Sequence, residues 1–223
     1  MRSAENFFEW AFDTRAKTVM KIYNGEQMSM EKMFISFCSH EPAFVSYGPA
    51  GLNASVKGVG FIPKDEYLED TLEVYLKHIK TFDPEDKTYS QRGLGILIEQ
   101  MYSKQARNRI DFTKLGSLEL AKKQSWENYQ VNKEAALIFH QPPMLSYKLK
   151  GRIEIYDEEQ SGKKELYQQF INAQHDMYHT PGGMDLWKKQ PAYIFHIEEI
   201  YDNSASKEGF GTRLEYHVPD KEL

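Results

Sequence analysis

Residues 111–157 read DFTKLGSLELAKKQSWENYQVNKEAALIFHQPPMLSYKLKGRIEIYD, and this stretch carries the clearest strand pattern in the chain. Ala135–His140 is a short apolar run, Gln141–Pro143 is a turn, and Leu145–Tyr156 alternates apolar and polar residues. Alternation with a period of two is typical of a strand that buries one face. Gly151 interrupts the alternation, which predicts a bulge or bend at that point. The stretch therefore predicts two strands joined by a tight turn.

The flanking sequence predicts further strands and the helices that separate them. Ala43–Tyr47 and Leu52–Ile62 are apolar-rich runs on either side of the turn Gly48–Gly51, a pattern typical of a hairpin. Tyr193–Tyr201 alternates as well and is expected to be a last long strand. Two segments have the apolar spacing of amphipathic helices: Lys64–Ile79 and Lys163–His179. Hairpins with helices between them predict an α+β fold whose antiparallel sheet curls into a barrel.

Composition limits the classes of protein that this sequence represents. Its 223 residues carry a formal net charge of −5 and are 40% hydrophobic, as in an ordinary globular protein. The acidic balance argues against a nucleic-acid partner, because phosphate backbones bind positive surfaces. No stretch approaches the roughly 20 apolar residues that span a bilayer, so no membrane partner is expected. Cys38 is the single cysteine, which excludes an internal disulfide and favours a cytoplasmic location.

Residues 111–157 resemble the core of the pyridoxamine 5′-phosphate oxidase-like, FMN-binding split-barrel family. In that family a strand leads into a short helix bearing serine, lysine or arginine. An asparagine-containing turn, a strand, and a hairpin to a strand ending in glycine follow. The matching parts here are Ile110–Leu115, Lys122–Asn128, Ala135–His140 and Ser146–Gly151. Leu52–Gly58 resembles the family's second strand, and Trp187–Tyr201 resembles its closing strand. The resemblance implies an antiparallel split β-barrel with peripheral helices.

The resemblance also implies FMN as the cofactor, with its phosphate at the short helix. A phosphate dianion needs cations, hydroxyls or free backbone N–H groups around it. Lys122, Lys123 and Ser125, together with the first turn of their helix, can supply these groups. Asn128, in the turn that follows, is a further candidate. Adjacent lysines on a helix are otherwise an ordinary solvated face, and this alternative stays open.

The isoalloxazine ring of FMN needs an apolar wall and polar groups at its pyrimidine edge. Asn53, Ser55 and Lys57 alternate with Ala54 and Val56, so the three polar side chains share one face of a strand. A cation near the pyrimidine edge is one way in which a protein tunes the electronics of a flavin. An exposed strand face without a ligand is the alternative. Further candidates for contact with the cofactor are Lys148 and Trp187.

The expected organisation is a single split-barrel domain over residues 1–223. Residues 63–108 separate strands that follow each other closely in the family, so we expect a helical insertion there. Residues 203–223 are expected to form a polar tail. Split-barrel relatives hold the flavin at a homodimer interface, and the resemblance therefore implies a homodimer with two sites.

Together these observations predict an FMN-dependent oxidoreductase that acts on a small-molecule substrate. One alternative is a haem- or other ligand-binding or sensing protein on the same barrel, without flavin turnover. Another is a barrel dimer whose cofactor site has decayed. His175 and His179 lie four residues apart on a predicted helix, a spacing that suits a metal. No glutamate of the metalloprotease pattern lies between them and no third ligand is evident, so no metal site is expected.

Overall fold

An antiparallel sheet organises the computed structural model, which describes residues 2–157, 162–179 and 190–216. Within these residues the sheet has eight strands in the order β2-β1-β5-β6-β7-β4-β3, and β8 pairs with β7. The strands are β1 (Ala43–Gly48), β2 (Gly51–Val56), β3 (Gly60–Pro63), β4 (Ile110–Leu118), β5 (Glu134–Gln141), β6 (Leu145–Tyr156), β7 (Ala192–Asp202) and β8 (Thr212–Arg213). This architecture is of the α+β split-barrel class that the sequence predicts.

The β5–β6 hairpin forms as expected. Its register pairs Ala135 with Gly151 and Phe139 with Tyr147. The predicted irregularity at Gly151 is confirmed, because the β6–β7 register shifts between Lys150 and Gly151. A Cβ atom at Gly151 would lie 1.9 Å from the backbone oxygen of His196, so only glycine fits this close approach of strands.

The prediction of one strand over Leu52–Ile62 was wrong. The chain forms β2 and β3 instead, and these lie at opposite ends of the sheet order. Between them, the Lys57 and Val59 amides donate to the backbone oxygens of Pro42 and His40. These bonds turn the chain away from the β1–β2 hairpin and towards β4, which β3 joins.

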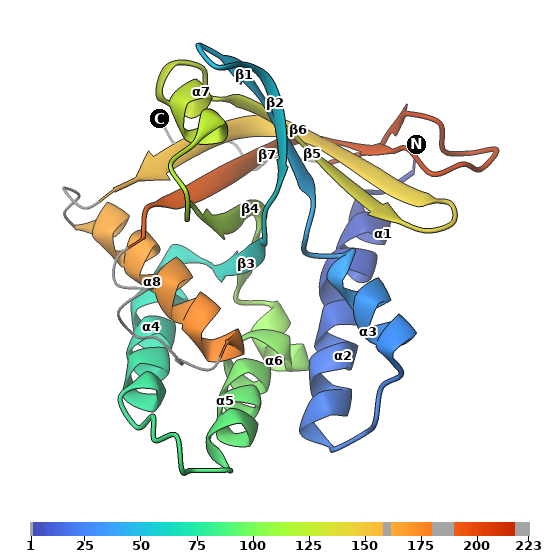
Figure 1. Cartoon of the computed structure of the whole chain (residues 1–223). Coiled ribbons are helices and arrows are strands. Elements are labelled where there is room, and N and C mark those ends of the chain that lie inside the picture. The colour runs from blue at the N-terminus through green and yellow to red at the C-terminus, as the bar shows by residue number, and fades with distance from the viewer. Residues whose placement is uncertain (1, 158–161, 180–189, 217–223) are drawn as a thin grey trace.

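Helices occupy the segment before β1 and several of the segments between strands. They are α1 (Glu5–Phe8), α2 (Thr14–Tyr23), α3 (Met30–Phe37), α4 (Asp65–Ile79), α5 (Tyr89–Leu97), α6 (Lys104–Arg107), α7 (Gln124–Val131) and α8 (Lys163–Tyr178), with π-helical turns η1 (Glu9–Asp13) and η2 (Ile98–Tyr102). Residues 63–108 thus contain α4, α5, η2 and α6. Figure 1 shows α2–α6 and α8 gathered below the sheet, whereas α7 lies beside the β1–β2 hairpin. No helix of the described residues is both long and apolar enough to cross a membrane.

Strand β7 faces a separate hydrophobic core on each side. Tyr193, Phe195 and Ile197 contribute to the core that includes Phe7 and Phe8. Ala192 and Ile194, which alternate with them, contribute to the core formed with α4 and α8. A strand buried on both faces reads as a nearly continuous apolar run, as β7 does here. The sheet therefore holds the helical layer on one face and the barrel interior on the other.

Candidate functional site

Asn128 fastens α7 to the β1–β2 hairpin. Its Nδ2 donates to the Gly51 backbone oxygen at 2.8 Å and to the Ser46 hydroxyl at 3.1 Å. Its Oδ1 accepts from the Ala50 amide at 2.9 Å. The side chain is fully buried, so both ends of its amide are occupied by these structural bonds. Asn128 thereby fixes the position of the α7 residues that were predicted to bind the phosphate.

The hydroxyl of Ser125 joins the strand residues expected beside it. Asn53 and Ser55 pair with Ser46 and Phe44 of β1, and they project from the same face of β2. Asn53 Nδ2 donates to Ser125 Oγ at 2.9 Å, and Ser55 Oγ lies 2.9 Å from the same oxygen. The structure therefore brings these three predicted site residues together under α7, around the Ser125 hydroxyl.

Lys57 adjoins this group and forms an ion pair with Glu119. Lys57 Nζ donates to Glu119 Oε2 at 2.8 Å, and the Tyr193 hydroxyl donates to the same oxygen at 2.8 Å. Glu119 is 2% exposed. Burial alone would raise the pKa of this carboxyl group, but hydrogen bonds from Lys57, Ala121 and Tyr193 outweigh burial and lower the pKa. Glu119 is therefore held as a carboxylate.

Glu119 is a site residue that the sequence did not reveal, and it also shapes the turn before α7. Its Oε1 accepts from the Ala121 and Lys122 amides at 2.9 Å each. The short helix expected from Lys122 begins only at Gln124, because this turn precedes it. The only signal in the sequence is an acidic residue set between Leu118 and Leu120 at the end of an apolar strand.

The start of α7 presents positive charge and backbone donors. Its N-cap residue is Lys123, and no side chain of the described residues caps the helix. Amides of the first turn are therefore left without a side-chain acceptor, a situation that favours an anion. Lys122 has a φ of 46°, and its Nζ lies 5.1 Å from the centre of the Trp126 ring. The same Nζ lies 3.7 Å from an Asp157 carboxylate oxygen.

Lys148 lies on a different face of the sheet from this group. Residues that pair across neighbouring strands project from the same face of a sheet. Lys148 lies in one such row with Ile138, Ala43 and Val56, so it projects from the face of the sheet that Val56 occupies. Its Nζ sits 4.4 Å from the centre of the Tyr201 ring. Because Asn53 and Ser55 project from the opposite face of β2, the structure does not bring Lys148 to them. Trp187 lies outside the described residues.

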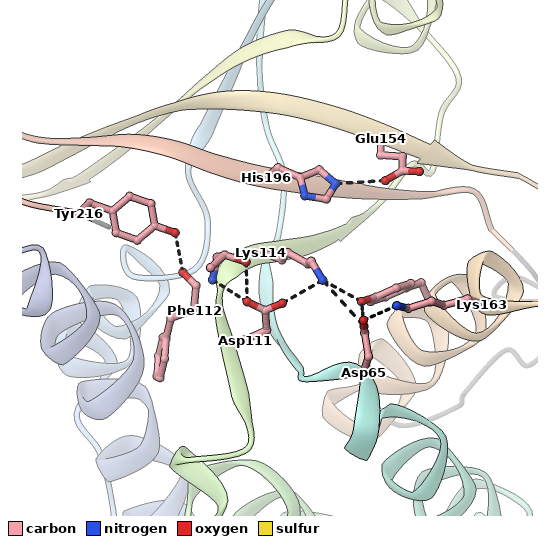
Figure 2. A network of polar contacts seen from close by, with 10 residues as sticks. Asp65, Asp111, Phe112, Lys114, Glu154, Lys163, His196 and Tyr216 are labelled. Atoms are coloured by element: carbon pink, nitrogen blue, oxygen red, sulfur yellow. Dashed lines mark hydrogen bonds and ion pairs between the residues drawn. The ribbon is translucent and has the colours of Figure 1, made fainter. Parts of the chain in front are cut away.

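A second polar network joins the helical layer to β4. Figure 2 shows Lys114 directed towards Asp111 and Asp65, with Lys163 on the far side of Asp65. Lys114 Nζ lies 2.9 Å from Asp111 Oδ2 and donates to the Tyr167 hydroxyl at 3.0 Å. Burial raises the pKa of Asp111, but hydrogen bonds from Thr113 and Lys114 lower it overall.

A neighbouring pair completes the network. His196 Nε2 lies 3.1 Å from Glu154 Oε2, and this bond, against the effect of burial, lowers the pKa of Glu154 to about 2. Every labelled acid in Figure 2 has a basic partner. The network is best explained as structural ion pairs and hydrogen bonds that connect α4 and α8 to the sheet. It contains none of the predicted cofactor-binding residues.

Two histidines lie close together at the C-terminal end of α8, His175 in its last turn and His179 at its C-cap. The rings of His175 and His179 are 4.5 Å apart between centroids. Among residues 2–157, 162–179 and 190–216, no group of three or more histidine, cysteine, aspartate or glutamate side chains is arranged to hold a metal ion.

The sheet and helices define an α+β split barrel. No family model and no curated protein matches the chain. Among solved structures it is similar to HupZ from Group A Streptococcus, with 13% identity, a TM-score of 0.43, and coverage of 85% of this chain and 100% of HupZ. It is similar to HutZ, the haem storage protein from Vibrio cholerae, with 10% identity, a TM-score of 0.42, and coverage of 78% and 95%.

A third similar structure is a protein from Clostridium acetobutylicum related to general stress protein 26 of B. subtilis, of the pyridoxinephosphate oxidase family. It has 13% identity, a TM-score of 0.39, and coverage of 79% of this chain and 87% of that chain. The similar structures thus include proteins of the family that the sequence resembles, at low identity.

Proposed function

We propose that this chain binds FMN at the start of α7 and uses it for oxidoreduction of a small molecule. The observation that carries the proposal is the uncapped first turn of α7, flanked by Lys122 and Lys123 and packed against the Asn53–Ser55–Ser125 group. Backbone N–H groups, ammonium groups and a hydroxyl are the donors that a phosphate monoester prefers. The donor set therefore fits the phosphate of FMN.

The rest of the site suits the flat part of the cofactor. Trp126 and Tyr193 lie next to each other with ring centroids 6.3 Å apart, and Lys57 Nζ is 5.6 Å from the centre of the Tyr193 ring. Tyr193 is fully buried and supports the half-buried Trp126, whose ring offers apolar surface. The charge of Lys57 is balanced by that of Glu119. The role of Lys57 is therefore to orient polar groups at the edge of the isoalloxazine ring, and it adds no net charge there.

FMN supplies hydride or electron transfer when it is bound, and the substrate is a small molecule. The residues of this chain hold and orient the cofactor. Lys122, Lys123 and the α7 amides bind its phosphate, Asn53 and Ser55 position its polar edge, and Asn128 keeps α7 in place.

A homodimer is part of the proposal, and the outer face of the β1–β2 hairpin supports it. Leu52, Tyr47 and Val56 are 77%, 65% and 67% exposed, and all project away from the Asn53–Ser55 face. Large apolar side chains gathered on one sheet face are typical of an interaction surface. Lys148 shares this outer face, so it reaches a cofactor only across the dimer interface.

A haem- or other ligand-binding protein without flavin turnover is the second candidate. The observation that favours it is the closeness of the His175 and His179 rings, because imidazole is a common ligand of haem iron. Burial, His175 and Arg15 together lower the pKa of His179, which keeps its imidazole in the neutral form that binds metals.

An absorption spectrum of the purified protein distinguishes these candidates. Flavin bands, or a quenching of FMN fluorescence on titration, would support the proposed function. A Soret band would support the second candidate.

A second test replaces both Lys122 and Lys123 by alanine. The control is Lys163→Ala/Lys164→Ala, because this is also a pair of adjacent lysines at the start of a helix, α8. FMN affinity should fall about tenfold in the first variant only.

A further inference from the structure

Arg15 of α2 reaches into the helical layer, away from the α7 site. Its guanidinium carbon lies 4.8 Å from the centre of the Tyr178 ring, at the end of α8. Its Nη1 lies 3.3 Å and 3.5 Å from the ring nitrogens of His40. Tyr102 of η2 is in contact with the same guanidinium. Residues from α2, η2, α8 and the segment after α3 thus meet at this point.

No carboxylate pairs with Arg15 among the ion pairs of the described residues. By contrast, Arg107 donates to Asp13 Oδ1 at 3.0 Å and to Glu5, and its guanidinium lies over Phe112. Other arginines that pair with carboxylates are Arg2, Arg92 and Arg213. Arg15 is partly buried, and an arginine stays charged at any relevant pH. Its charge therefore has no carboxylate partner in the part of the chain that the structure describes.

The groups around Arg15 do not neutralise it. Burial and, to a smaller extent, the nearby Tyr102 raise the pKa of Tyr178 well above its ordinary value. These effects outweigh that of Arg15, which lowers this pKa, so the phenol of Tyr178 is uncharged. Burial and Arg15 lower the pKa of His40 to about 3, so that ring is neutral as well. Asp176, a carboxylate on this end of α8, contacts His175 at 3.3 Å. A positive charge between neutral aromatic groups is a site that attracts an anion.

The same place has more hydrogen-bond donors than acceptors. The Tyr102 and Tyr178 hydroxyls form one hydrogen bond with each other. This bond uses the hydrogen of one hydroxyl, and the hydrogen of the other is left to donate elsewhere. Burial and the nearby Tyr102 raise the pKa of Tyr75. Its hydroxyl is buried and has no hydrogen-bond partner among residues 2–157, 162–179 and 190–216. A buried hydroxyl without a partner costs free energy, and an oxyanion offers the acceptors that these donors lack.

We propose that Arg15, Tyr102 and Tyr178 form a binding site for a small oxyanion, separate from the FMN site at α7. The ligand is a phosphate group, either free or part of a small phosphorylated metabolite. Arginine suits it because the planar guanidinium matches two oxyanion oxygens at once. This site does not depend on the proposed function, since it uses none of the residues around α7.

The test is isothermal titration of the full chain with inorganic phosphate and, in a parallel arm, with glycerol 3-phosphate at constant ionic strength. Binding of phosphate is expected in the wild type, about tenfold weaker binding in Arg15→Gln, and a smaller loss in Tyr178→Phe. Arg107→Gln is the matched control and should bind as the wild type does. The Lys122→Ala/Lys123→Ala variant should also retain this binding, which separates the two sites.

The two titrations also distinguish the source of the phosphate group. Tighter binding of glycerol 3-phosphate than of inorganic phosphate would indicate a phosphorylated metabolite, and equal binding would indicate free phosphate.

A labelling experiment on the wild type keeps the proposal testable if Arg15→Gln does not fold. Phenylglyoxal modifies accessible guanidinium groups, and mass spectrometry reads the extent of modification at each arginine. Phosphate should slow the modification of Arg15 several-fold and leave Arg107 unchanged. Equal modification of Arg15 with and without phosphate, or equal phosphate affinity in wild type and Arg15→Gln, would overturn the proposal.

Discussion

Lys57 and Glu119 form a buried ion pair with 2.8 Å between Nζ and Oε2, and this pair connects the end of β2 to the end of β4. The side chain of Lys57 is 13% exposed and that of Glu119 is 2% exposed. The pair stands where β2 and β3 part, and Glu119 also shapes the turn before α7. It therefore supports the geometry of the whole candidate site.

Removing one partner of this pair should be costly. Lys57→Met leaves the Glu119 carboxylate buried without its cation, and we expect a loss of about 3 kcal/mol in the free energy of unfolding. The double variant Lys57→Met/Glu119→Leu should lose less, since no charge is left unpaired. Urea denaturation measures both. Lys77→Ala, which removes an exposed pair with Glu73, is the control and should cost under about 1 kcal/mol. A single variant as stable as the control would refute this account of the pair.

Stability should fall as the pH drops below about 6.5, and His40 should account for part of that fall. Burial and Arg15 hold the pKa of His40 at about 3, below its ordinary value of 6.5. The unfolded chain therefore binds a proton that the folded chain excludes, and stability is lost as the pH falls from 6.5 towards 3. His78 and His179 also have lowered pKa values and act in the same direction.

The contribution of His40 is isolated by comparing wild type with His40→Gln. Urea denaturation between pH 7.5 and 5 should show a steeper loss of stability in the wild type than in the variant. Parallel curves for the two proteins would show that His40 titrates normally in the folded state. Carboxylates with lowered pKa values, such as Glu119 and Glu154, add their loss only at lower pH, because their stabilisation is present above their unfolded pKa.

Gly48 should tolerate no side chain, because α7 packs directly on it. A Cβ at this position would lie 2.9 Å from the Asn128 Cα and 3.0 Å from its backbone oxygen. Gly48→Ala should therefore displace α7, lower the melting temperature by several degrees and weaken FMN binding. Gly58→Ala is the matched control, since a Cβ there meets nothing within 4 Å. Equal melting temperatures for the two variants would contradict the packing described here.

The outer face of the β1–β2 hairpin should hold two copies of the chain together. Leu52→Asp places a charge in the centre of that face, and we expect it to convert a dimer into a monomer. Light scattering coupled to gel filtration measures the change in mass. Phe210→Asp is the control, because Phe210 is equally exposed, at 76%, but lies beyond β7. A monomeric wild type would contradict the proposed homodimer.

Local pattern predicted the parts of the fold whose residues are neighbours in the sequence. The β5–β6 hairpin, the bulge at Gly151 and helix α8 follow from alternation and helical spacing alone. Period-two alternation likewise placed Asn53 and Ser55 on one face. These features depend on contacts that the pattern itself defines.

What the sequence did not show depends on long-range contacts. Lys57 and Glu119 are 62 residues apart, and no local pattern indicates that they pair. The break between β2 and β3 depends on bonds to Pro42 and His40, and the position of Lys148 depends on the order of strands across the sheet. Arg15 and Tyr178 likewise meet only because α2 and α8 pack in the same layer.

Titration of the purified protein with FMN, followed by flavin fluorescence, tests the central claim most directly. The account predicts saturable quenching with one FMN per chain, and affinity about tenfold lower in Lys122→Ala/Lys123→Ala than in Lys163→Ala/Lys164→Ala. Absence of FMN binding by the wild type, or equal affinity in the two lysine variants, would contradict a flavin site at the start of α7.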